Sequence, residues 1–408
     1  MISTLLYMFM TFSNFHGCAL ASDNLTGYVV TLDTTLLLKT SDGGATWVII
    51  NTTASRKFFD VTCKNGSHIW TCGILGEIMH SRDGGQTWQQ QATGISKYMT
   101  RIEFLDTLTG WCVGGDGTIA YTTNGGDFWN IIFTPWYEAE YYGVSFSDNL
   151  SLYAVAGWPD NYLEKQGYIV KSEDGGATWT LLKRSEGFDE YLDIHVINND
   201  TIVVVGGNDI TLEPIILRST DGGASWDSIT GLPLSARYLR AVDFVGLKGW
   251  AVGRAGTILH TEDGGLTWIS QYSPADSTLF DVDFSDELHG IACGYNYIIY
   301  TNDGGQTWRP GYLQSIMEPE ANILKFQVLT PIFIREAKFK VEGSENSKLR
   351  LKIYEASGNL IRVIENISGN EFVWDGKNFK GMEAKEGLYY ALLEVKGKIV
   401  GQKLIKIR

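Results

Sequence analysis

Seven aspartate or asparagine side chains recur in one short motif and are the first candidates for chemistry in this 408-residue chain. The motif reads Ser/Thr-x-Asp-Gly-Gly-x-x-Trp, and its third position is occupied by Asp42, Asp83, Asn124, Asp174, Asp221, Asp263 and Asp303. Carboxylates can bind metal ions or transfer protons. Seven equivalent sites spread along a repeat cannot all converge on one substrate, however. We therefore predict a structural role, in which the Asp side chain accepts backbone N–H groups and glycine supplies the positive φ of the turn.

Loop carboxylates are the second set of candidates. Glu138 or Glu140 together with Asp160 could form the pair of facing carboxylates, about 5–9 Å apart, that a glycoside hydrolase needs. A secreted, sialidase-like glycoside hydrolase is therefore the alternative function. The chain lacks the Arg-Ile-Pro signature of sialidases, a phosphate-binding glycine loop and a nucleophile elbow. We expect no catalytic residue, metal or cofactor, and histidines are spread over different repeats.

Cysteine usage leaves a disulfide open. Cys63 and Cys72 flank the hairpin turn Asn65-Gly66 and could pair in an oxidising compartment. Buried free thiols are the equal alternative.

The spacing of the motif predicts the fold. Its terminal tryptophans fall at positions 47, 88, 129, 179, 226, 268 and 308, and a period of 40 to 50 residues is typical of repeat architectures. Around the sixth motif, residues 242–244, 249–253, 256–260 and 267–269 have the pattern of four short strands. Four strands per repeat favour a seven-bladed β-propeller over residues 22–328, with a linear β-solenoid as the alternative. The first repeat lacks its first strand, and spacing predicts that residues 322–326 supply it and close the ring.

Binding residues are expected on the face opposite the Asp-Gly-Gly turns, because the long steps of 50 and 47 residues enlarge the loops there. The predicted binding residues are Trp136, Tyr137, Glu138, Glu140, Tyr141, Trp158, Asp160, Tyr162, Glu190 and Tyr191. Basic residues map to the same face: Lys97, Arg101, Arg237, Arg240 and Arg254. This mixture suits a peptide, a basic protein surface or a sugar. The predicted function is non-catalytic binding of a protein or glycan by a monomer.

Export is predicted from the N-terminus. Residues 4–12 are apolar but too short to cross a bilayer, and Ala19-Leu20-Ala21 resembles a cleavage site, so residues 1–21 are predicted to be a signal peptide. A buried first strand is the alternative. We expect an extracellular or cell-surface location, with the periplasm as alternative, and no membrane span. The net charge of −14 argues against nucleic acid as a partner.

The C-terminal segment, residues 329–408, is predicted to be a small Ig-like β-sandwich. Residues 324–408 carry 16 Lys/Arg and 10 Asp/Glu, a net of +6, whereas the rest carries 17 and 37, a net of −20. Such asymmetry indicates two separate modules. Alternating segments at 338–341, 349–354 and 360–364 are typical of strands.

Two family resemblances follow from these motifs. The Asp-Gly-Gly turns resemble Asp-box (BNR) repeats. The longer pattern in residues 242–268 resembles the photosystem II assembly factors and their bacterial relatives, which implies a non-enzymatic binding or assembly protein over residues 25–328. In the C-terminal module, Ile353-Tyr354, Trp374-Asp375-Gly376 and Gly387-Leu388-Tyr389-Tyr390 resemble the type IX secretion sorting domain and the Ig-like domain of flagellar hook-capping proteins. That resemblance implies delivery by secretion machinery, although Leu329-Thr330-Pro331 departs from the usual Pro-Asn-Pro opening.

Overall fold

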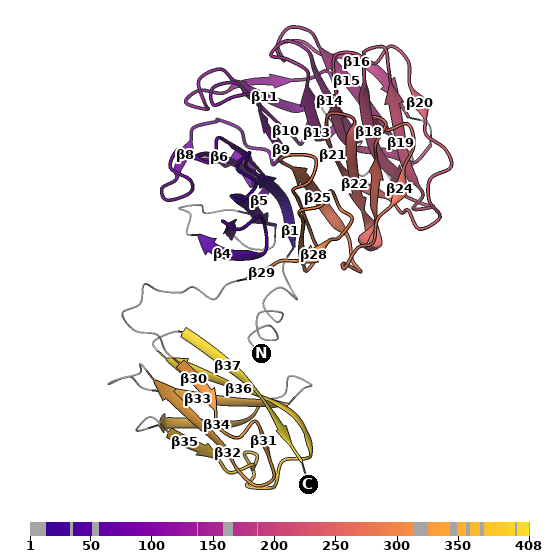
Figure 1. The fold of residues 1–408 in the computed structure, drawn as a ribbon. Helices are drawn as coiled ribbons and strands as arrows, with labels where there is room; N and C mark the ends of the chain where they lie inside the picture. Colours follow the sequence, from indigo (N-terminus) through magenta and orange to yellow (C-terminus); the bar gives the residue numbers. More distant parts are fainter. Residues whose placement is uncertain are drawn as a thin grey trace. The chain divides into compact units, whose positions relative to one another are not determined.

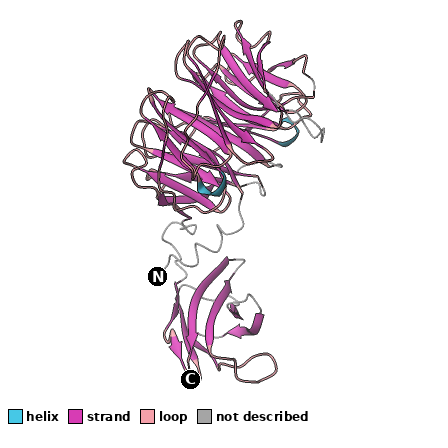
Figure 2. Ribbon diagram, turned by 90° about the vertical axis from the view of Figure 1, so that its right-hand side faces the viewer, coloured by secondary structure: helices cyan, strands magenta, loops and turns pink. Residues whose placement is uncertain are grey.

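The computed structural model shows an all-β chain, as the sequence predicts, in two compact units (Figures 1 and 2). The larger unit is Leu6–Gln314, and the smaller contains Ser315–Arg408. Among the described residues, helix is confined to two single 3-10 turns, Ile74–Gly76 and Arg254–Gly256. The structure describes residues 14–32, 36–50, 57–136, 138–157, 166–185, 187–313, 325–342, 349–355, 360–367, 371–395 and 398–407.

Antiparallel sheets of four consecutive strands make up the larger unit, and β29 (Tyr312–Leu313) adds a parallel fifth strand to the first of them. The first three sheets consist of β1 (Phe15–Leu20), β2 (Gly27–Thr31), β3 (Leu37–Thr40) and β4 (Thr46–Ile50); β5 (Phe58–Lys64), β6 (His68–Gly73), β7 (Ile78–Ser81) and β8 (Gln89–Gln91); and β9 (Met99–Phe104), β10 (Gly110–Gly114), β11 (Thr118–Thr122) and β12 (Asn130–Phe133). The next two consist of β13 (Glu140–Phe146), β14 (Leu152–Gly157), β15 (Gly167–Ser172) and β16 (Thr180–Arg184); and β17 (Asp189–Val196), β18 (Ile202–Asn208), β19 (Pro214–Ser219) and β20 (Asp227–Ser228). The last two consist of β21 (Leu239–Val245), β22 (Lys248–Gly253), β23 (Ile258–Thr261) and β24 (Ile269–Ser270); and β25 (Leu279–Phe284), β26 (Gly290–Gly294), β27 (Tyr297–Thr301) and β28 (Arg309–Pro310).

The sheets form a closed ring in which the first strand of each sheet lies innermost. Along the chain, β1, β5, β9, β13, β17, β21 and β25 each contact the next, and β25 contacts β1 (Figure 1). Apolar side chains fill the space between neighbouring sheets, as in the cluster of Trp250, Phe284 and Trp308. This propeller-like arrangement matches the fold predicted from the repeat.

The strand that closes the ring is not the one predicted. The innermost place in the first sheet is taken by β1, which pairs with β2, so residues 322–326 are not needed there. Instead β30 (Lys325–Val328) pairs with β32 (Ala337–Glu342) in the smaller unit. The alternative of a buried first strand therefore fits Phe15–Leu20. Its apolar and small residues resemble the end of an export signal because an innermost strand needs the same residue types.

Two carboxylates of the last sheet hold β1 in place. Asp281 Oδ2 accepts the backbone N–H of Cys18 at 2.8 Å, and Asp283 Oδ2 accepts that of Leu20 at 2.6 Å. A hydrogen bond to a charged group typically contributes about 1.5–3 kcal/mol. Carboxylates join other innermost strands in the same way, since Asp60 accepts a hydrogen bond from the backbone N–H of Ile102.

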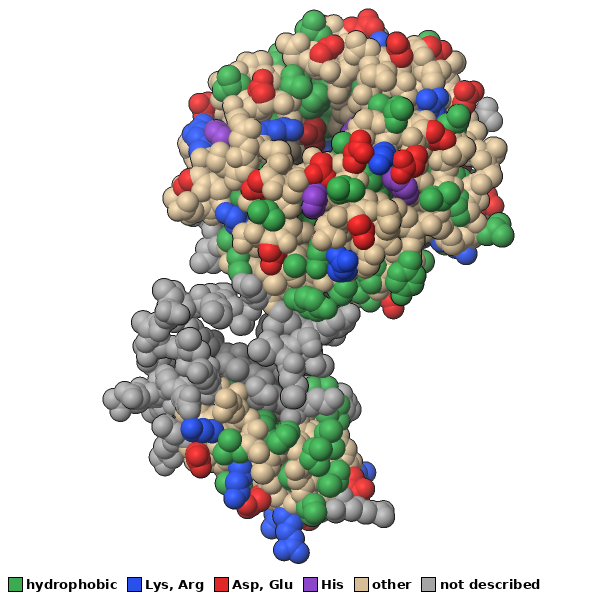
Figure 3. All heavy atoms as spheres, viewed as in Figure 1, with side chains coloured by type: hydrophobic (Ala, Val, Ile, Leu, Met, Phe, Trp, Pro, Cys, Tyr) green, Lys and Arg blue, Asp and Glu red, His purple; other side chains and the backbone are tan. Residues whose placement is uncertain are grey.

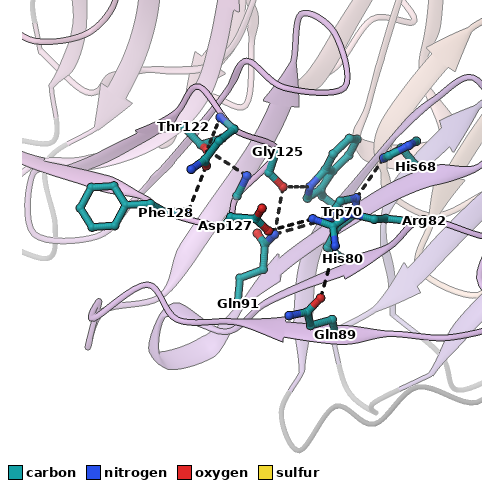
Figure 4. Close-up of polar contacts among 12 residues, drawn as sticks. His68, Trp70, His80, Arg82, Gln89, Gln91, Thr122, Gly125, Asp127 and Phe128 are labelled. Atoms are coloured by element: carbon teal, nitrogen blue, oxygen red, sulfur yellow. Dashed lines mark hydrogen bonds and ion pairs between the residues drawn. The ribbon is translucent and has the colours of Figure 1, made fainter.

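The Asp-box turns of the second to seventh sheets join each of these sheets to the preceding one. Within each turn a side-chain oxygen of the Asp or Asn accepts the backbone N–H of the residue four positions later, as Asp83 Oδ1 does from Thr87 at 2.8 Å. The first glycine then presents its carbonyl to the neighbouring sheet, and Trp70 Nε1 donates to Gly125 O at 3.1 Å (Figure 4). We call this bond the Asp-box clasp. Its other donor–acceptor pairs are Tyr28–Gly84, Trp111–Gly175, Tyr153–Gly222, Arg218–Gly264 and Trp250–Gly304.

At the third and seventh turns, a glutamine from the preceding sheet adds further hydrogen bonds. Gln91 Nε2 donates to Gly125 O at 3.0 Å (Figure 4), and its Oε1 accepts Trp129 Nε1 at 2.9 Å. Gln271 makes the equivalent bonds to Gly304 O and Trp308 Nε1. In the other turns the Trp N–H bonds within its own turn, as Trp47 does to Gly44 O.

The smaller unit contains two sheets around one apolar core. One sheet has the order β30, β32 and β35 (Glu371–Trp374); the other has the order β31 (Ile332–Phe333), β37 (Lys398–Lys406), β36 (Gly387–Val395), β33 (Leu349–Glu355) and β34 (Leu360–Ile367). Phe339 and Trp374 of the first sheet and Leu351 of the second belong to this core. Because β30 belongs here, the module begins before residue 329.

We predict that a chain beginning at Ser22 loses at least about 3 kcal/mol of unfolding free energy relative to one beginning at Asn14, because Asp281 and Asp283 lose their charge-assisted bonds. Urea denaturation followed by tryptophan fluorescence measures this difference. Identical unfolding midpoints for the two chains would contradict the placement of β1.

Candidate functional site

A buried ion cluster lies at the centre of the ring. Arg101 reaches from β9 toward carboxylates of three other sheets: its Nη1 is 2.8 Å from Asp281, its Nη2 is 3.6 Å from Asp193 and its Nε is 3.7 Å from Asp60. Burial raises the pKa of Asp60 to about 8 and that of Asp193 to about 6, and in both cases Arg101 opposes the rise. One guanidinium thus holds together residues from four sheets.

A β-bulge in every innermost strand lies next to this cluster. The register slips by one residue at His16, Phe59, Thr100, Tyr142, Leu192, Arg240 and Phe280. A bulge re-aims one side chain without changing the rest of the strand. Here the seven bulged residues stand at the same level of the ring, near the start of each innermost strand and therefore on the face opposite the Asp-box turns.

Aromatic rings meet at this level and define a surface that we call the central mouth. The His16 ring stacks on Phe280 with 5.2 Å between centroids and meets Phe59 edge-on at 5.5 Å. Phe59 in turn lies 5.9 Å from Tyr98. The mouth consists of His16, Phe59, Tyr98, Glu140, Tyr142, Glu190, Arg240 and Phe280, and Tyr238 is buried beside it at 1% exposure.

Tyrosine hydroxyls engage the two carboxylates of the mouth. Glu140 accepts hydrogen bonds from Tyr98 and, at 3.0 Å, from Tyr142. Glu190 is buried and accepts the hydroxyl of Tyr238. Burial and the adjacent Glu140 raise the pKa of Tyr142 well above its usual value, which keeps that hydroxyl protonated and donating. These carboxylates are acceptors fixed in a network.

Arginines flank the mouth on one side. The guanidinium of Arg240 lies over the rings of Tyr238 and Phe280, at 5.2 and 5.8 Å, and that of Arg254 lies 4.8 Å over Tyr238. Arg254 and Arg237 line an open hollow of about 550 Å³ that also contains Phe280. In the described part of the chain, none of these three arginines forms an ion pair.

The structure places the predicted binding residues in different environments. Glu140 and Glu190 contribute to the central mouth, Glu138 is exposed outside it, and Trp136 packs partly against a core cluster. Tyr141 and Tyr191 are buried between sheets, at 0% and 3% exposure, and do not line the face, because the bulge places the following residue there. Tyr137, Trp158, Asp160 and Tyr162 lie outside the described residues, as does the predicted carboxylate pair that includes Asp160.

Sequence reasoning missed the ion cluster and grouped Arg101 with other basic residues on the face opposite the Asp-box turns. A signal was present: Asp60, Arg101, Asp193 and Asp281 each stand directly before the apolar residue that begins the alternating part of an innermost strand. The basic residue Lys97, expected on the same face, forms an ion pair with Asp116.

The Asp-box carboxylates are held in their own turns. Hydrogen bonds from the Thr87 hydroxyl and backbone lower the pKa of Asp83 to about 2.

Among the described residues, no group of three or more His, Cys, Asp or Glu side chains is arranged to hold a metal ion. No helix in the described ranges has the length and apolarity to cross a membrane. Acidic and basic side chains are interspersed over the visible face of the larger unit (Figure 3).

Comparison with known proteins points to one family. Residues 48–120 and 186–273 match the family model described as Photosynthesis system II assembly factor YCF48. These segments are YCF48-like. Residues 299–310 match the BNR/Asp-box repeat. A photosystem II assembly lipoprotein, Ycf48 of Synechococcus sp. (strain CC9902), is 31% identical over 100 residues, which are 23% of this chain and 30% of that relative's length.

Solved structures agree in fold. A structure titled YCF48 bound to D1 peptide has a TM-score of 0.57 at 18% identity and covers 72% of this chain and 94% of its own. YCF48 from Cyanidioschyzon merolae gives 0.55 at 19% identity, over 73% and 97%. Hydrazine synthase of Kuenenia stuttgartiensis gives 0.58 at 11% identity, over 72% and 97%. At these identities the likeness concerns the fold, which serves both a peptide-bound protein and an enzyme.

We predict that Arg101→Met lowers the unfolding free energy by about 3–5 kcal/mol at pH 8, because three facing carboxylates lose their only cation in the cluster. The loss should be smaller at pH 5. Carboxyls with raised folded-state pKa values contribute stability at low pH and lose it as pH rises through those values.

Urea titrations at the two pH values measure this effect. Lys97→Met is the matched control, because its exposed pair with Asp116 should contribute no more than about 1 kcal/mol. Equal losses for both variants would contradict the role of the cluster.

Proposed function

We propose that this chain is an exported, non-catalytic seven-bladed β-propeller that binds a segment of a partner protein at the central mouth. The observation that carries the proposal is the combination of aromatic rings with three arginines that form no ion pair within the described residues. Guanidinium groups recognise carboxylates through paired hydrogen bonds. The bound segment is therefore acidic.

A peptide fits this surface better than a sugar. The mouth and the adjoining hollow form a continuous open surface through Phe280, which suits an extended chain. The structure of a YCF48 bound to a peptide supports the same class of ligand on the same fold. The hydrolase alternative needs Glu138 or Glu140 paired with Asp160, which lies outside the described residues, and Glu140 accepts two tyrosine hydroxyls.

Location outside the cytoplasm is part of the proposal. It is supported by the apolar N-terminal run and by the relative named as a lipoprotein. Because β1 begins at Phe15, processing after Ala21 would remove a strand of the ring, so we place any cleavage before that strand.

We further propose that the smaller unit is an Ig-like sorting module read by secretion machinery. Its motifs around Tyr354, Trp374 and Tyr389 and its two-sheet core support this assignment. Its opposite net charge supports a separate role from the ring.

Binding can be tested with an array of synthetic dodecapeptides that differ in Asp/Glu and Lys/Arg content. We expect the full chain to retain acidic peptides. Arg237→Ala/Arg254→Ala should weaken binding of those peptides about tenfold or more, since each tenfold is about 1.4 kcal/mol. Fluorescence anisotropy measures the dissociation constants.

The matched control is Arg82→Ala, which removes an exposed arginine paired with Asp127 beside an Asp-box turn. Equal binding of acidic and basic peptides, or equal losses in the double variant and the control, would contradict the proposal. Turnover of chromogenic glycosides would support the hydrolase alternative instead.

Deletion of residues 315–408, which include β30, tests the sorting module. We expect the shortened chain to be made but to remain inside the cell, because the secretion machinery no longer finds its signal. Fractionation with immunodetection measures delivery. Unchanged delivery would overturn the sorting role without affecting the peptide-binding proposal.

A further inference from the structure

Cysteine side chains lie in pairs across two junctions between neighbouring sheets. Cys18 of β1 and Cys293 of β26 share one buried apolar cluster, and Cys72 of β6 and Cys112 of β10 share another. Burial first, and then the neighbouring cysteine of the pair, raise the pKa of the Cys18 and Cys72 thiols. All four cysteines are free and buried. These pairs differ from the one considered in the sequence.

The hairpin pair Cys63 and Cys72 does not face each other. In the β5–β6 register, Cys63 lies opposite Ile69 and Cys72 lies opposite Asp60. A disulfide across an antiparallel hairpin needs opposed positions, because the Cα atoms must lie within about 4.4–6.8 Å. The Cys63–Cys72 disulfide is therefore disfavoured.

The junction that contains Cys18 and Cys293 lacks the Asp-box clasp. Among the described residues, the Gly43 carbonyl of the first turn receives no bond from the last sheet. Ile291 stands in the last sheet at the position where most other sheets carry a tyrosine or tryptophan donor, and it has no side-chain donor; the fifth sheet uses Arg218 of its third strand instead. This junction also joins the two ends of the ring, and at its outer edge Tyr312 and Leu313 extend from the last sheet to pair with Thr46 and Trp47 of the first.

Backbone proximity favours this pair over the other. β1 and β26 contact each other closely along the junction. β6 and β10 are second strands of neighbouring sheets and do not pack as closely, as expected where facing sheets lie about 10 Å apart. The Cys18 thiol reaches across the junction and donates to Ile291 O at 3.9 Å, two residues from Cys293.

We propose that Cys18 and Cys293 form a disulfide that closes the ring covalently when the chain folds in an oxidising environment. The oxidant is a disulfide of small-molecule or thiol-oxidoreductase type. The first cysteine thiolate attacks that disulfide and releases one thiol, and the second cysteine attacks the mixed disulfide and releases the other. The two cysteines lose two electrons and two protons, and the oxidant becomes two thiols.

Folding determines when this exchange takes place. Burial raises the pKa of both thiols, so the closed ring keeps them protonated as well as out of reach. Exchange therefore takes place before β1 docks between β5 and β25. Once docked, the same burial protects the disulfide from reductants.

Refolding of the full chain tests the proposal. The reduced, urea-unfolded chain is diluted into a glutathione redox buffer, free thiols are alkylated, and a non-reducing digest is analysed by mass spectrometry. We expect a cross-linked peptide that joins Cys18 to Cys293 and a higher urea midpoint than in the reduced protein. Recovery of both cysteines as alkylated peptides, or either one joined to another cysteine, would overturn the proposal.

Two variants separate this disulfide from other causes. Cys293→Ser should abolish the cross-link and the difference in midpoint between oxidised and reduced protein. Cys112→Ser is the matched control, because it removes a buried cysteine of the other pair and should leave both unchanged. Loss of the Cys18–Cys293 peptide in the control would also contradict the proposal. The test on the unmodified chain does not depend on whether either variant folds.

Discussion

The ring depends on one backbone carbonyl at each clasped junction between sheets, that of the first glycine of the Asp-box. Two consecutive positive φ angles, 72° and 86° at Gly84 and Gly85, turn this carbonyl outward toward the preceding sheet. The Asp side chain fixes the turn from within, so the acceptor has the same position each time. The donor is free to vary: tyrosine, tryptophan and arginine all serve. A constant acceptor with variable donors explains how repeats with diverged strands still assemble in one geometry.

The repeat made the strands and turns predictable from sequence. The fixed offset from each Asp-Gly-Gly to its tryptophan, and the alternating pattern around it, reflect local requirements on φ and burial that a single sequence displays. Ring closure was not predictable in this way. Phe15–Leu20 carries no Asp-box, and a strand that is buried on both faces has the composition of an export signal. Only the bonds from Asp281 and Asp283, more than two hundred residues away, identify it as a strand.

The sequence indicated on which face of the ring the candidate site lies, but not which residues line it. Loop positions predicted one side of the ring for the site, and Glu140 and Glu190 contribute to the central mouth on that side. The bulges could not be read from the sequence, and a one-residue slip exchanges Tyr142 for Tyr141 at the mouth. The central ion cluster illustrates the same limit. Arg101 and its three aspartates come from four sheets, so their charges look like isolated surface residues until the ring brings them together.

The two residues of β29, Tyr312–Leu313, have a mechanical consequence. They pair in parallel with Thr46 and Trp47 at the outer edge of the first sheet, so the chain leaves the ring from the sheet in which the ring began. The chain thus enters and leaves the ring through the first sheet, with β1 at one edge of this sheet and β29 at the other. A pulling force applied to the two ends of the chain, as during translocation, would act on this sheet first. The other six sheets would stay shielded until it gave way, so the order of mechanical unfolding is set by where the chain departs.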